Sequence, residues 1–586
     1  MEGWNKRCQR GWCGRFTLDG AVRVNNLGLF DRLFPPDRDS RSAILYDHRE
    51  IVYAELRDET IRVAEVLNGL DIKREDRVAI LLADSPEFIA SFVAIISLGA
   101  IAVPINLALR REEQLFVLKD CGACAAIVEA NVTKNLFEET DALSDLKDVL
   151  IVSRERDPRV APIKRPNGQS FANANRRPLH SFSTIAQETA DALPHGRATA
   201  PNDDAANGRA TAPLDSEALA DTRTTAPLDR DAFILYTSGS TGEPKGAVHS
   251  QADIFYTNET YCREVLNLRA GDRLFSSSRL PFAYGLGNAF TFPLLNGFTT
   301  ILCREKPAPA VISEVFTDYR PTIFFGVPVV YRMLLEHHRN VAPLDTSSLR
   351  LCISAGEALP AQLGEEWEKT FAVPALDGIG STEMLHMFMS NHDGEVRYGS
   401  SGKLLQGYQA QLVDHDGAAT EMGEVGNLWI RGASAASRYW ERAETTTQTF
   451  VDGWVRTGDL YRCDKDGFWW HMGRSDDCFK PTGQWVSPIE VESVLVRHEA
   501  VRAAAVVEGF DRDGLSYVCA FLVLTDGRDP DSVEREIRTL CESALPRFKQ
   551  PRRYYFVSEF PYTATGKVQR FKLREQLRGE RVAHQE

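Results

Sequence analysis

The chain has 586 residues, of which 43% are apolar and 26% charged, and its formal net charge is −14 because 82 acidic residues outnumber 68 Lys and Arg. This composition is ordinary for a globular protein and excludes collagen-like, wholly disordered and small disulfide-rich chains. The acidic balance argues against a nucleic-acid binder and against attachment to an anionic membrane. The eleven cysteines are an odd number without framework spacing, so we expect reduced thiols in a cytoplasmic protein. Length alone suggests about four domains.

From the pattern of apolar and charged residues we expect neither a signal peptide nor a membrane span. Residues 1–25 are basic but have no apolar core, so we expect an N-terminal extension and not a secretory signal. The longest apolar stretch, Phe88–Pro104, contains two serines and two helix interrupters and is shorter than the roughly 18 to 20 residues that a spanning helix needs. It predicts a buried helix that ends near Gly99, followed by a strand over Ala100–Val103.

Short apolar runs alternate with amphipathic stretches from about residue 43 to residue 130. Val78–Leu82, Ala125–Val128 and Val149–Val152 predict buried strands, and a helix is expected to begin at Pro86. This alternation is typical of a layered α/β fold with a largely parallel sheet.

The alternation stops at about residues 154–229, where the chain is polar and repeats itself. Similar heptads begin at Arg197, Arg209 and Arg223. Each repeat is too short and polar to bury a face, so we expect a disordered insertion and not a solenoid. Two interpretations remain open, a tether or docking motif and a tolerated surface insertion produced by duplication.

The α/β alternation resumes after the insertion and continues to Trp470, and a polar joint then leads to a region of about 110 residues. That region has its own expected elements, which are strands over Ala503–Val507 and Val518–Leu524 and helices over Pro488–Arg497 and Asp531–Ala544. We therefore predict a large domain over residues 26–475, made of layered α/β subdomains, and a small mobile α+β domain over residues 476–586.

A glycine- and hydroxyl-rich loop follows the buried strand predicted over Phe233–Tyr236. The segment Thr237–Gly246 reads TSGSTGEPKG, which combines many backbone N–H and hydroxyl donors with one lysine and suits a polyphosphate. A Walker loop is excluded, since Gly239 has no glycine five positions later and Gly246 follows Lys245 where Ser or Thr is required. A flexible linker is not expected directly after a buried strand.

The segment Tyr236–Gly246 resembles the signature of the adenylate-forming superfamily of acyl-CoA synthetases, aryl-acid adenylating enzymes and firefly-type luciferases. The resemblance covers nearly the whole chain outside the first two dozen residues and the insertion. Leu376–His386, Phe282–Asn288 and Ser475–Pro488 look most like the benzoate-CoA ligase branch.

The resemblance implies two half-reactions, in which a carboxylate and ATP form an acyl-adenylate and pyrophosphate, and the thiol of CoA then displaces AMP. Thr237 and the loop after it would hold the β- and γ-phosphates, and Glu383 would be a catalytic ligand of Mg²⁺. A lone glutamate at the end of a strand is otherwise usually solvated. The remaining nucleotide contacts implied are Ser238, Gly239, Ser240, Thr241, Gly242, Lys245, Ser354, Ala355, Gly356, Glu357, Asp377, Gly378, Ile379, Gly380, Ser381 and Thr382.

Three residues farther along the chain complete the nucleotide site that the resemblance implies. Asp459 suits the ribose hydroxyls, because one carboxylate can accept from two O–H donors. Arg474 looks like a second contact to ribose and α-phosphate oxygens. Lys567 would be the catalytic cation beside the carboxylate and the α-phosphate, although a lysine after glycine is by itself more often a solvated loop residue.

The joint between the domains resembles the hinge of the family. Asp476 matches the residue about which the small domain rotates, although Asp476-Asp477 also suits a turn or a helix cap. The pantetheine tunnel for CoA would be formed by Lys480, Gly483 and Trp485. Relatives commonly have small or aliphatic residues where Pro481 and Gln484 stand, which weakens the prediction on the CoA side.

The acid pocket implied by the branch has an aromatic wall and no buried charge, which suits a flat, compact aryl acid. Tyr284 and Ile379 could equally be core residues, and His386 could be a buried core histidine. Benzoate, hydroxybenzoate and aminobenzoate are not distinguished. The matching positions are Ala283, Tyr284, Gly285, Gly356, Ile379 and His386.

The leading hypothesis is an AMP-forming aryl-CoA ligase that uses ATP, Mg²⁺ and CoA, with a carrier protein or a downstream acyltransferase as further partners. A stand-alone ligase that loads an aryl group onto a carrier protein is one alternative, and a catalytically silent acyl-binding or scaffold protein is another. The pair Cys121 and Cys124 has thioredoxin-like spacing, but no other part of such a redox site is visible.

Overall fold

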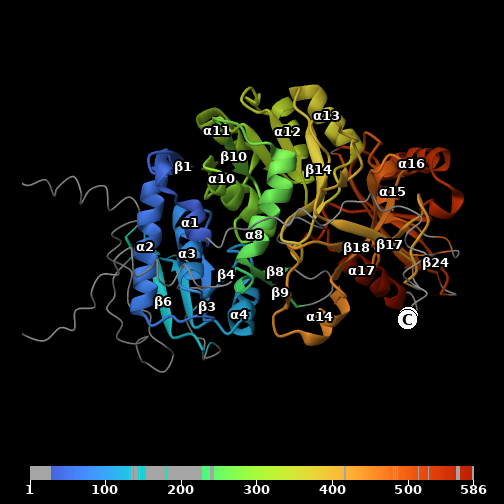
Figure 1. Ribbon diagram of the computed structural model, residues 1–586. Coiled ribbons are helices and arrows are strands. Elements are labelled where there is room, and N and C mark those ends of the chain that lie inside the picture. The colour runs from blue at the N-terminus through green and yellow to red at the C-terminus, as the bar shows by residue number, and fades with distance from the viewer. Residues whose placement is uncertain are drawn as a thin grey trace, which may run out of the picture.

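The computed structural model describes most of the chain from residue 28 to residue 583. Its gaps are residues 131, 133–135, 137–142, 144, 154–178, 181–227, 238–242, 415–416, 480, 482–483, 485, 512–513, 526 and 563–567. Two large sheets with their helices make up most of the molecule, and the C-terminal part lies at the end far from the blue helix α2 (Tyr53–Gly69) (Figure 1).

An eight-stranded sheet contains the strands predicted from the first apolar runs. It has the order β19-β9-β8-β4-β3-β5-β6-β7 and is parallel from β8 to β7, whereas β9 and β19 run antiparallel at one edge. Its strands are β3 (Arg77–Leu81), β4 (Ile101–Pro104), β5 (Ala125–Glu129), β6 (Asp148–Ser153), β7 (Leu179–His180), β8 (Asp231–Thr237), β9 (Lys245–Ser250) and β19 (Arg438–Tyr439). The predicted parallel sheet is therefore confirmed.

A nine-stranded sheet has the order β16-β15-β14-β13-β12-β10-β11-β1-β2. The run from β14 to β1 is parallel, and β2, β15 and β16 are antiparallel additions. The strands are β1 (Ser42–Tyr46), β2 (Arg49–Val52), β10 (Arg273–Ser276), β11 (Thr299–Ile301), β12 (Ile323–Gly326), β13 (Leu351–Ser354), β14 (Ala375–Gly380), β15 (Met387–Ser390) and β16 (Lys403–Leu404).

Helices pack on the two sheets, and the apolar stretch after residue 86 forms the most completely buried of the longer ones. Helix α3 (Pro86–Ser97) begins at the N-cap Ser85, whose hydroxyl accepts from the Phe88 N–H at 3.3 Å, and Gly99 follows it with φ +74°. In the described part of the chain no helix is long and apolar enough to cross a membrane. The remaining helices of the large sheets are α1 (Leu29–Leu33), α4 (Arg111–Asp120), α8 (Gln251–Thr257), α9 (Ala283–Leu286), α10 (Phe292–Leu295), α11 (Pro309–Tyr319), α12 (Pro328–Asn340) and α13 (Ala361–Phe371), the 3₁₀ turn η1 (Pro36–Arg38), and the π-helical segments η2 (Asn258–Leu266) and η3 (Gly287–Thr291).

A five-stranded antiparallel sheet follows the nine-stranded one in the chain. It comprises β17 (Gln409–Val413), β18 (Gly426–Arg431), β20 (Phe450–Val451), β21 (Trp454–Cys463) and β22 (Trp469–Arg474). Within the described residues from Met387 to Arg474, α14 (Ala443–Thr449) is the one helix. The expectation that the α/β alternation continues to Trp470 is therefore wrong, because these strands are half-exposed and pair antiparallel with one another without crossover helices.

The C-terminal part has a small sheet and a core of its own. Strands β23 (Val501–Phe510) and β24 (Ser516–Leu524) are antiparallel, and β25 (Arg553–Phe556) runs parallel to β24. The helices are α15 (Pro488–Leu495), α16 (Pro530–Ala544) and α17 (Arg570–Ala583), with the 3₁₀ turn η4 (Arg547–Lys549). Both of its hydrophobic clusters consist of residues from Phe479 onward, as expected for a small α+β unit.

Most of the predicted extension and insertion, including all of the repeats up to residue 227, lies outside the described residues. Within the span expected to be disordered, Leu179 and His180 form β7 and pair with Val152 and Ser153 of β6. Leu228, near the end of that span, packs on the hydrophobic core that contains Phe92 and Phe233. Its carbonyl accepts from the Ala252 N–H at 3.0 Å.

The described cysteines are all free thiols. Cys121 is buried, and burial raises its pKa to about 12, while burial also raises the pKa of Cys124. Neither thiol has the depressed pKa of a redox cysteine, so the redox interpretation has no structural support.

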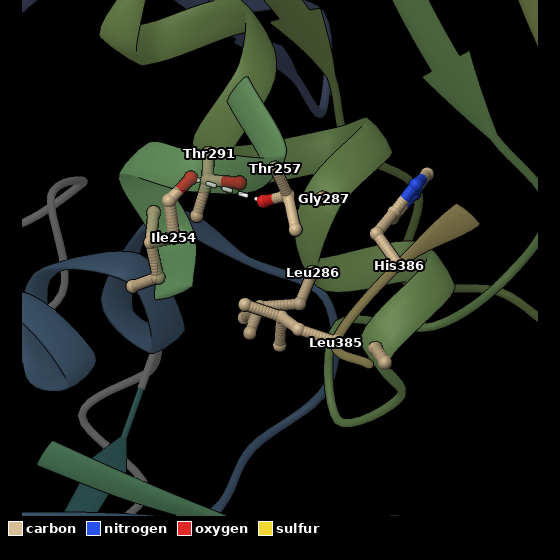
Figure 2. A pocket seen from close by; sticks show the side chains of 8 residues that line it. Ile254, Thr257, Leu286, Gly287, Thr291, Leu385 and His386 are labelled. Carbon is tan, nitrogen blue, oxygen red and sulfur yellow. Dashed lines mark hydrogen bonds between the residues drawn. The ribbon is translucent and has the colours of Figure 1, made fainter. Parts of the chain in front are cut away.

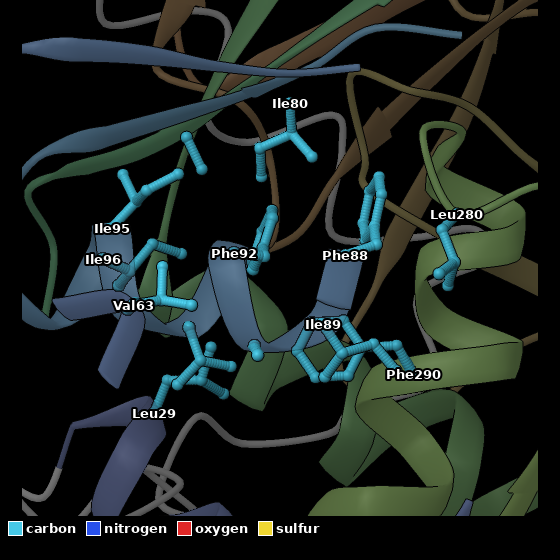
Figure 3. Packing of buried hydrophobic residues seen from close by; sticks show 14 of the residues in the cluster. Leu29, Val63, Ile80, Phe88, Ile89, Phe92, Ile95, Ile96, Leu280 and Phe290 are labelled. Carbon is cyan, nitrogen blue, oxygen red and sulfur yellow. The ribbon is translucent and has the colours of Figure 1, made fainter. Parts of the chain in front are cut away.

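Truncating a core side chain of α3 should show how much the stability of the fold depends on the packing of this helix against the eight-stranded sheet. Phe92 is fully buried, and its ring centroid lies 5.4 Å from that of Phe233 and 5.6 Å from that of Phe290 (Figure 3). We expect Phe92→Ala to lower the free energy of unfolding by about 3–5 kcal/mol, because it leaves a cavity. Denaturant unfolding measures this loss. Val341→Ala is the control, since Val341 is 74% exposed and its truncation should cost little; equal losses in both variants would contradict the prediction.

Candidate active site

The carboxyl ends of two adjacent parallel strands place two polar side chains side by side. Ser354 ends β13 and is the register partner of Asp377 in β14. Both residues are buried, and the Ser354 Oγ and Asp377 Oδ1 atoms have no hydrogen-bond partner among the described residues. Burial raises the pKa of Asp377 well above its ordinary value. Buried polar atoms are almost always satisfied, so this pair suits a ligand that brings donors.

The segment after Ser354 lies close to the C-terminal part. Gly356 has φ +90°, and Ala355 is buried beneath it. Burial raises the pKa of Tyr562, and the charge of Glu357 raises it further, so the carboxylate and the phenol are near one another. Residues of the C-terminal part therefore approach the edge where Ser354 and Asp377 meet.

The phosphate-loop residues lie between two antiparallel strands, although the tip of the loop falls outside the described residues. Thr237 pairs with Lys245 across β8 and β9. A Cβ atom on Gly246 would lie 2.6 Å from the Ile234 side chain, so only glycine fits there. The predicted contacts outside the described residues are Ser238, Gly239, Ser240, Thr241 and Gly242.

Hydrogen bonds from a distant helix anchor the base of this loop. The Tyr236 hydroxyl donates to Asp120 Oδ2 at 2.7 Å, and Arg442 Nη2 donates to Asp120 Oδ1 at 2.6 Å. The carboxylate at the end of α4 thus connects the start of the loop with the segment after β19. A charge-assisted pair of this kind holds both segments in register.

The turn after β14 carries the predicted metal ligand. One ring nitrogen of His249 lies 2.8 Å from the Thr382 carbonyl oxygen, and the other lies 2.8 Å from Asp253 Oδ2. The Glu383 carboxylate accepts from the Tyr439 hydroxyl at 2.6 Å, and its carbonyl accepts from the Ala436 N–H at 2.7 Å. Contacts from β9 and from β19 therefore fix the turn on two sides.

The carboxylate of Glu383 suits a magnesium ion whose other ligands would be phosphate oxygens of a bound nucleotide. Among the described residues there is no group of three or more His, Cys, Asp and Glu side chains suited to a metal ion. Mg²⁺ characteristically takes one or two carboxylates and completes its shell with phosphate oxygens and water. Glu383 with the phosphates of a nucleotide satisfies that requirement. Gly378, Ile379, Gly380 and Ser381 lie along β14 and the start of this turn.

Asp459 and Arg474 lie opposite each other in the antiparallel sheet. They are register partners in β21 and β22, and Arg474 Nη1 donates to Asp459 Oδ1 at 3.4 Å and to the Thr457 carbonyl at 3.2 Å. His471 Nε2 lies 3.5 Å from the same carboxylate oxygen. The Arg474 side chain is 43% exposed, so its remaining N–H donors can reach a ligand.

At the joint between the large and the C-terminal parts, the hinge candidate Asp476 is followed by a residue that forms an ion pair. Asp476 is exposed, whereas Asp477 Oδ1 lies 2.9 Å from Arg574 Nη1 on α17. Arg570 on the same helix donates to both oxygens of Glu492, at 2.9 and 2.8 Å. The predicted residues Lys480, Gly483, Trp485 and Lys567 lie outside the described residues.

A small pocket adjoins α9 and the turn that carries His386 (Figure 2). Two predicted acid-pocket residues, Ala283 and His386, line it. Its other lining residues, which the sequence analysis did not identify, are Ile254, Thr257, Leu286, Gly287, Thr291 and Leu385.

The other predicted acid-pocket residues do not line this space. The Tyr284 hydroxyl donates to the carbonyls of Gly326 and Ile353, both at 3.3 Å. The Tyr284 side chain and Ile379 both pack on the hydrophobic core that contains Tyr261 and Phe292. A Cβ atom on Gly285 would lie 2.1 Å from the Arg279 carbonyl oxygen, so close backbone approach requires this glycine. Gly356 lies at the edge described above.

His386 is buried among aromatic rings, with centroids of Tyr261 and Phe292 each 4.7 Å from its own. Neither ring nitrogen has a hydrogen-bond partner among the described residues. Burial lowers its pKa to about 3, so the ring is neutral near pH 7 and can offer one donor and one acceptor.

Most of the residues that position the predicted ones have no distinctive pattern in the sequence. These residues make side-chain contacts whose partners lie between 4 positions apart, as for His249 and Asp253, and 322 positions apart, as for Asp120 and Arg442. Tyr439 is the fifth residue of this group. Of these residues only Asp253 lies in a recognisable local pattern, because Ser250 caps α8 and Asp253 follows three residues later.

Comparisons with known proteins place the chain in a family. Residues 36–440 match the AMP-binding enzyme model, and residues 490–567 match the AMP-binding enzyme C-terminal domain. The chain is 36% identical over 540 residues to a benzoate–CoA ligase of Thauera aromatica, covering 92% of this chain and 93% of the relative. It is 34% identical over 558 residues to a 4-hydroxybenzoate–CoA/benzoate–CoA ligase of Rhodopseudomonas palustris, covering 94% and 93%. The crystal structure of an anthranilate CoA ligase in complex with anthranoyl-AMP has a TM-score of 0.79 and 33% identity, covering 95% of this chain and 99% of that one.

The chain belongs to the AMP-binding enzyme family. Within the adenylate-forming superfamily it belongs to the benzoate-CoA ligase branch, as the motifs indicated.

The depressed pKa of His386 makes a testable contribution to stability. Its pKa is about 3 in the folded protein and 6.5 in an unfolded chain, so only the unfolded chain binds this proton between those values. The contribution is therefore complete above pH 6.5 and is lost as the pH falls toward 3, at up to about 1.4 kcal/mol per pH unit. We expect His386→Gln to make the pH dependence of unfolding shallower between pH 6.5 and 4.5.

The measurement is denaturant unfolding at several pH values. Val341→Ala, which alters no titratable group, is the control and should keep the wild-type slope. An unchanged slope in His386→Gln would refute the assignment.

Proposed function

We propose that this protein activates an aromatic carboxylic acid with ATP, through an enzyme-bound acyl-adenylate, and transfers the acyl group to the thiol of CoA with release of AMP and pyrophosphate. The observation that carries the proposal is the convergence at one edge of two unpaired buried polar atoms, of Ser354 and Asp377, and the carboxylate of Glu383. The chain's place in the benzoate-CoA ligase branch supports it.

The roles follow from the chemistry of each group. The loop between Thr237 and Lys245 would bind the β- and γ-phosphates, and Glu383 would hold Mg²⁺ on them. Ser354 and Asp377, with the backbone from Ala355 to Glu357, would contact the adenine. Asp459 would accept from the ribose hydroxyls, and Arg474 would donate to ribose and α-phosphate oxygens.

The acid would bind beside Ala283 and His386, where apolar and aromatic groups surround one neutral histidine. Such surroundings suit a flat aryl ring better than a long alkyl chain or a second carboxylate, which would remain unpaired. Benzoate and its hydroxy- or amino-substituted forms are the substrate class proposed.

ATP–pyrophosphate exchange with a panel of aromatic acids tests this function directly. We expect exchange with at least one benzoate and little with long-chain fatty acids, because the apolar and aromatic groups of the proposed acid site suit a compact aryl ring. AMP release with CoA, compared with a holo-carrier protein, identifies the acceptor. Absence of exchange with every aromatic acid would refute the proposed function.

Lys567→Ala should separate the two half-reactions. A preorganised cation near the carboxylate and α-phosphate acts on charge that develops during adenylation, so its loss should slow acyl-adenylate formation by about 10²–10³-fold. Thioester formation from supplied acyl-adenylate and CoA should persist. Asp476→Pro, at the exposed joint, should show the reverse pattern, since it restricts rotation and leaves the adenylation residues intact. Parallel losses in both half-reactions would contradict these roles.

A further inference from the structure

Tyr439 occupies an unusual place at the edge of the eight-stranded sheet. It lies on the short strand β19, where it pairs with Ala247 of β9, and it is only 5% exposed. Its hydroxyl donates to Oε1 of Glu383 at 2.6 Å, which is the distance of a strong, charge-assisted hydrogen bond. No hydrogen bond to the second oxygen, Oε2, occurs among the residues that the structure describes.

The ring of Tyr439 also meets the lysine at the end of the phosphate loop. The Lys245 ammonium lies 5.7 Å from the ring centroid, within range of a cation–π interaction. In the described part of the chain no carboxylate lies within 4.0 Å of this ammonium group. Tyr439 therefore contacts a cation through its ring and an anion through its hydroxyl.

Lys245 and Glu383 therefore contact the same side chain. Without the ring and the hydroxyl that engage them, the ammonium and the carboxylate could form an ion pair with each other. Such a pair would engage both charges with each other and reduce what each can offer to a nucleotide. A tyrosine hydroxyl is suited to prevent this, because it is a neutral donor at neutral pH and the carboxylate accepts from it without losing its charge.

We propose that Tyr439 is a positioning residue for the metal-binding step. Its hydroxyl fixes one oxygen of Glu383, and its ring keeps Lys245 apart, so that the second oxygen of Glu383 faces a Mg²⁺ ion carried by the nucleotide phosphates. This inference rests on the proposed function, in which Glu383 is the metal ligand.

A purely structural role for Tyr439 makes a different prediction. The ring packs on Phe450, with centroids 5.4 Å apart, in a small cluster with Ala247 and Ala436. If Tyr439 served only to fill this cluster, removing its hydroxyl would change stability slightly and leave metal binding unaltered. Partners that orient a metal ligand typically change metal affinity by about 10–100-fold when they are removed.

Metal binding can be measured without turnover. Mn²⁺ is titrated into protein saturated with a non-hydrolysable ATP analogue, and free Mn²⁺ is followed by electron paramagnetic resonance. We expect Tyr439→Phe to weaken Mn²⁺ binding by about 10-fold and to raise by a similar factor the Mg²⁺ concentration needed for half-maximal pyrophosphate exchange. Thioester formation from supplied acyl-adenylate should be unchanged, because it does not involve the metal-bound phosphates.

Tyr53→Phe is the matched control. Tyr53 is fully buried on α2, far along the chain, and its hydroxyl donates to the Phe298 carbonyl at 2.9 Å. This variant loses a buried hydroxyl of the same kind, and its Mn²⁺ affinity should match the wild type. Tyr439→His, which keeps an aromatic ring with an N–H donor, should recover part of the lost affinity, and it carries the same test if Tyr439→Phe does not fold.

A double-mutant cycle shows whether Tyr439 acts through Glu383. Glu383→Gln alone should weaken Mn²⁺ binding at least as much as Tyr439→Phe, and adding Tyr439→Phe to it should change the affinity less than twofold. Unchanged Mn²⁺ affinity in Tyr439→Phe, or losses that multiply in the double variant, would overturn the inference. Wild-type protein without any pyrophosphate exchange, or Glu383→Gln with normal affinity, would instead refute the proposed function on which it rests.

Discussion

The hydrogen bonds around the turn from Thr382 to Glu383 are the interactions on which the site depends. The turn follows β14 of the nine-stranded sheet, whereas His249 and Tyr439 belong to β9 and β19 of the eight-stranded sheet. These bonds join the two sheets at the edge where the phosphate loop also lies. A shift of one sheet against the other would therefore change the position of Glu383 relative to the loop, and both halves of the nucleotide site would be lost together.

The same edge contains polar groups whose hydrogen-bonding capacity the described residues do not use. Asp377 and Ser354 are buried without full pairing, and His386 is buried with both ring nitrogens unpaired. Leaving a buried polar group unsatisfied costs about 1–3 kcal/mol, which the folded protein tolerates because its large cores stabilise it. A ligand that completes these bonds recovers that free energy on binding, so the unpaired atoms favour a polar occupant over an apolar one.

The sequence predicted the elements well where one local cause is sufficient. The buried strands β3, β5 and β8 follow from apolar runs, and the helix α3 follows from an apolar run bounded by Ser85-Pro86 and Gly99. All four lie within one or two residues of the predicted bounds. The half-exposed antiparallel strands between Gln409 and Arg474 do not follow the α/β alternation that the sequence predicts there. Their pairing comes from neighbours along the sheet, and buried and exposed residues do not alternate strictly even along the ten residues of β21, so the sequence shows no clear period of two.

By itself, the sequence determined the fold class, the family and the residues with chemically distinctive character, such as Glu383, Asp459 and Arg474. These properties are local, because a motif fixes residue type and spacing along the chain. Only the tertiary structure decided that Tyr439 contacts both Lys245 and Glu383, and that Asp120 anchors Tyr236 from more than a hundred residues away. Such contacts depend on which strands become neighbours in a sheet. That choice is made by the burial of whole apolar faces, and no short segment of the sequence records it.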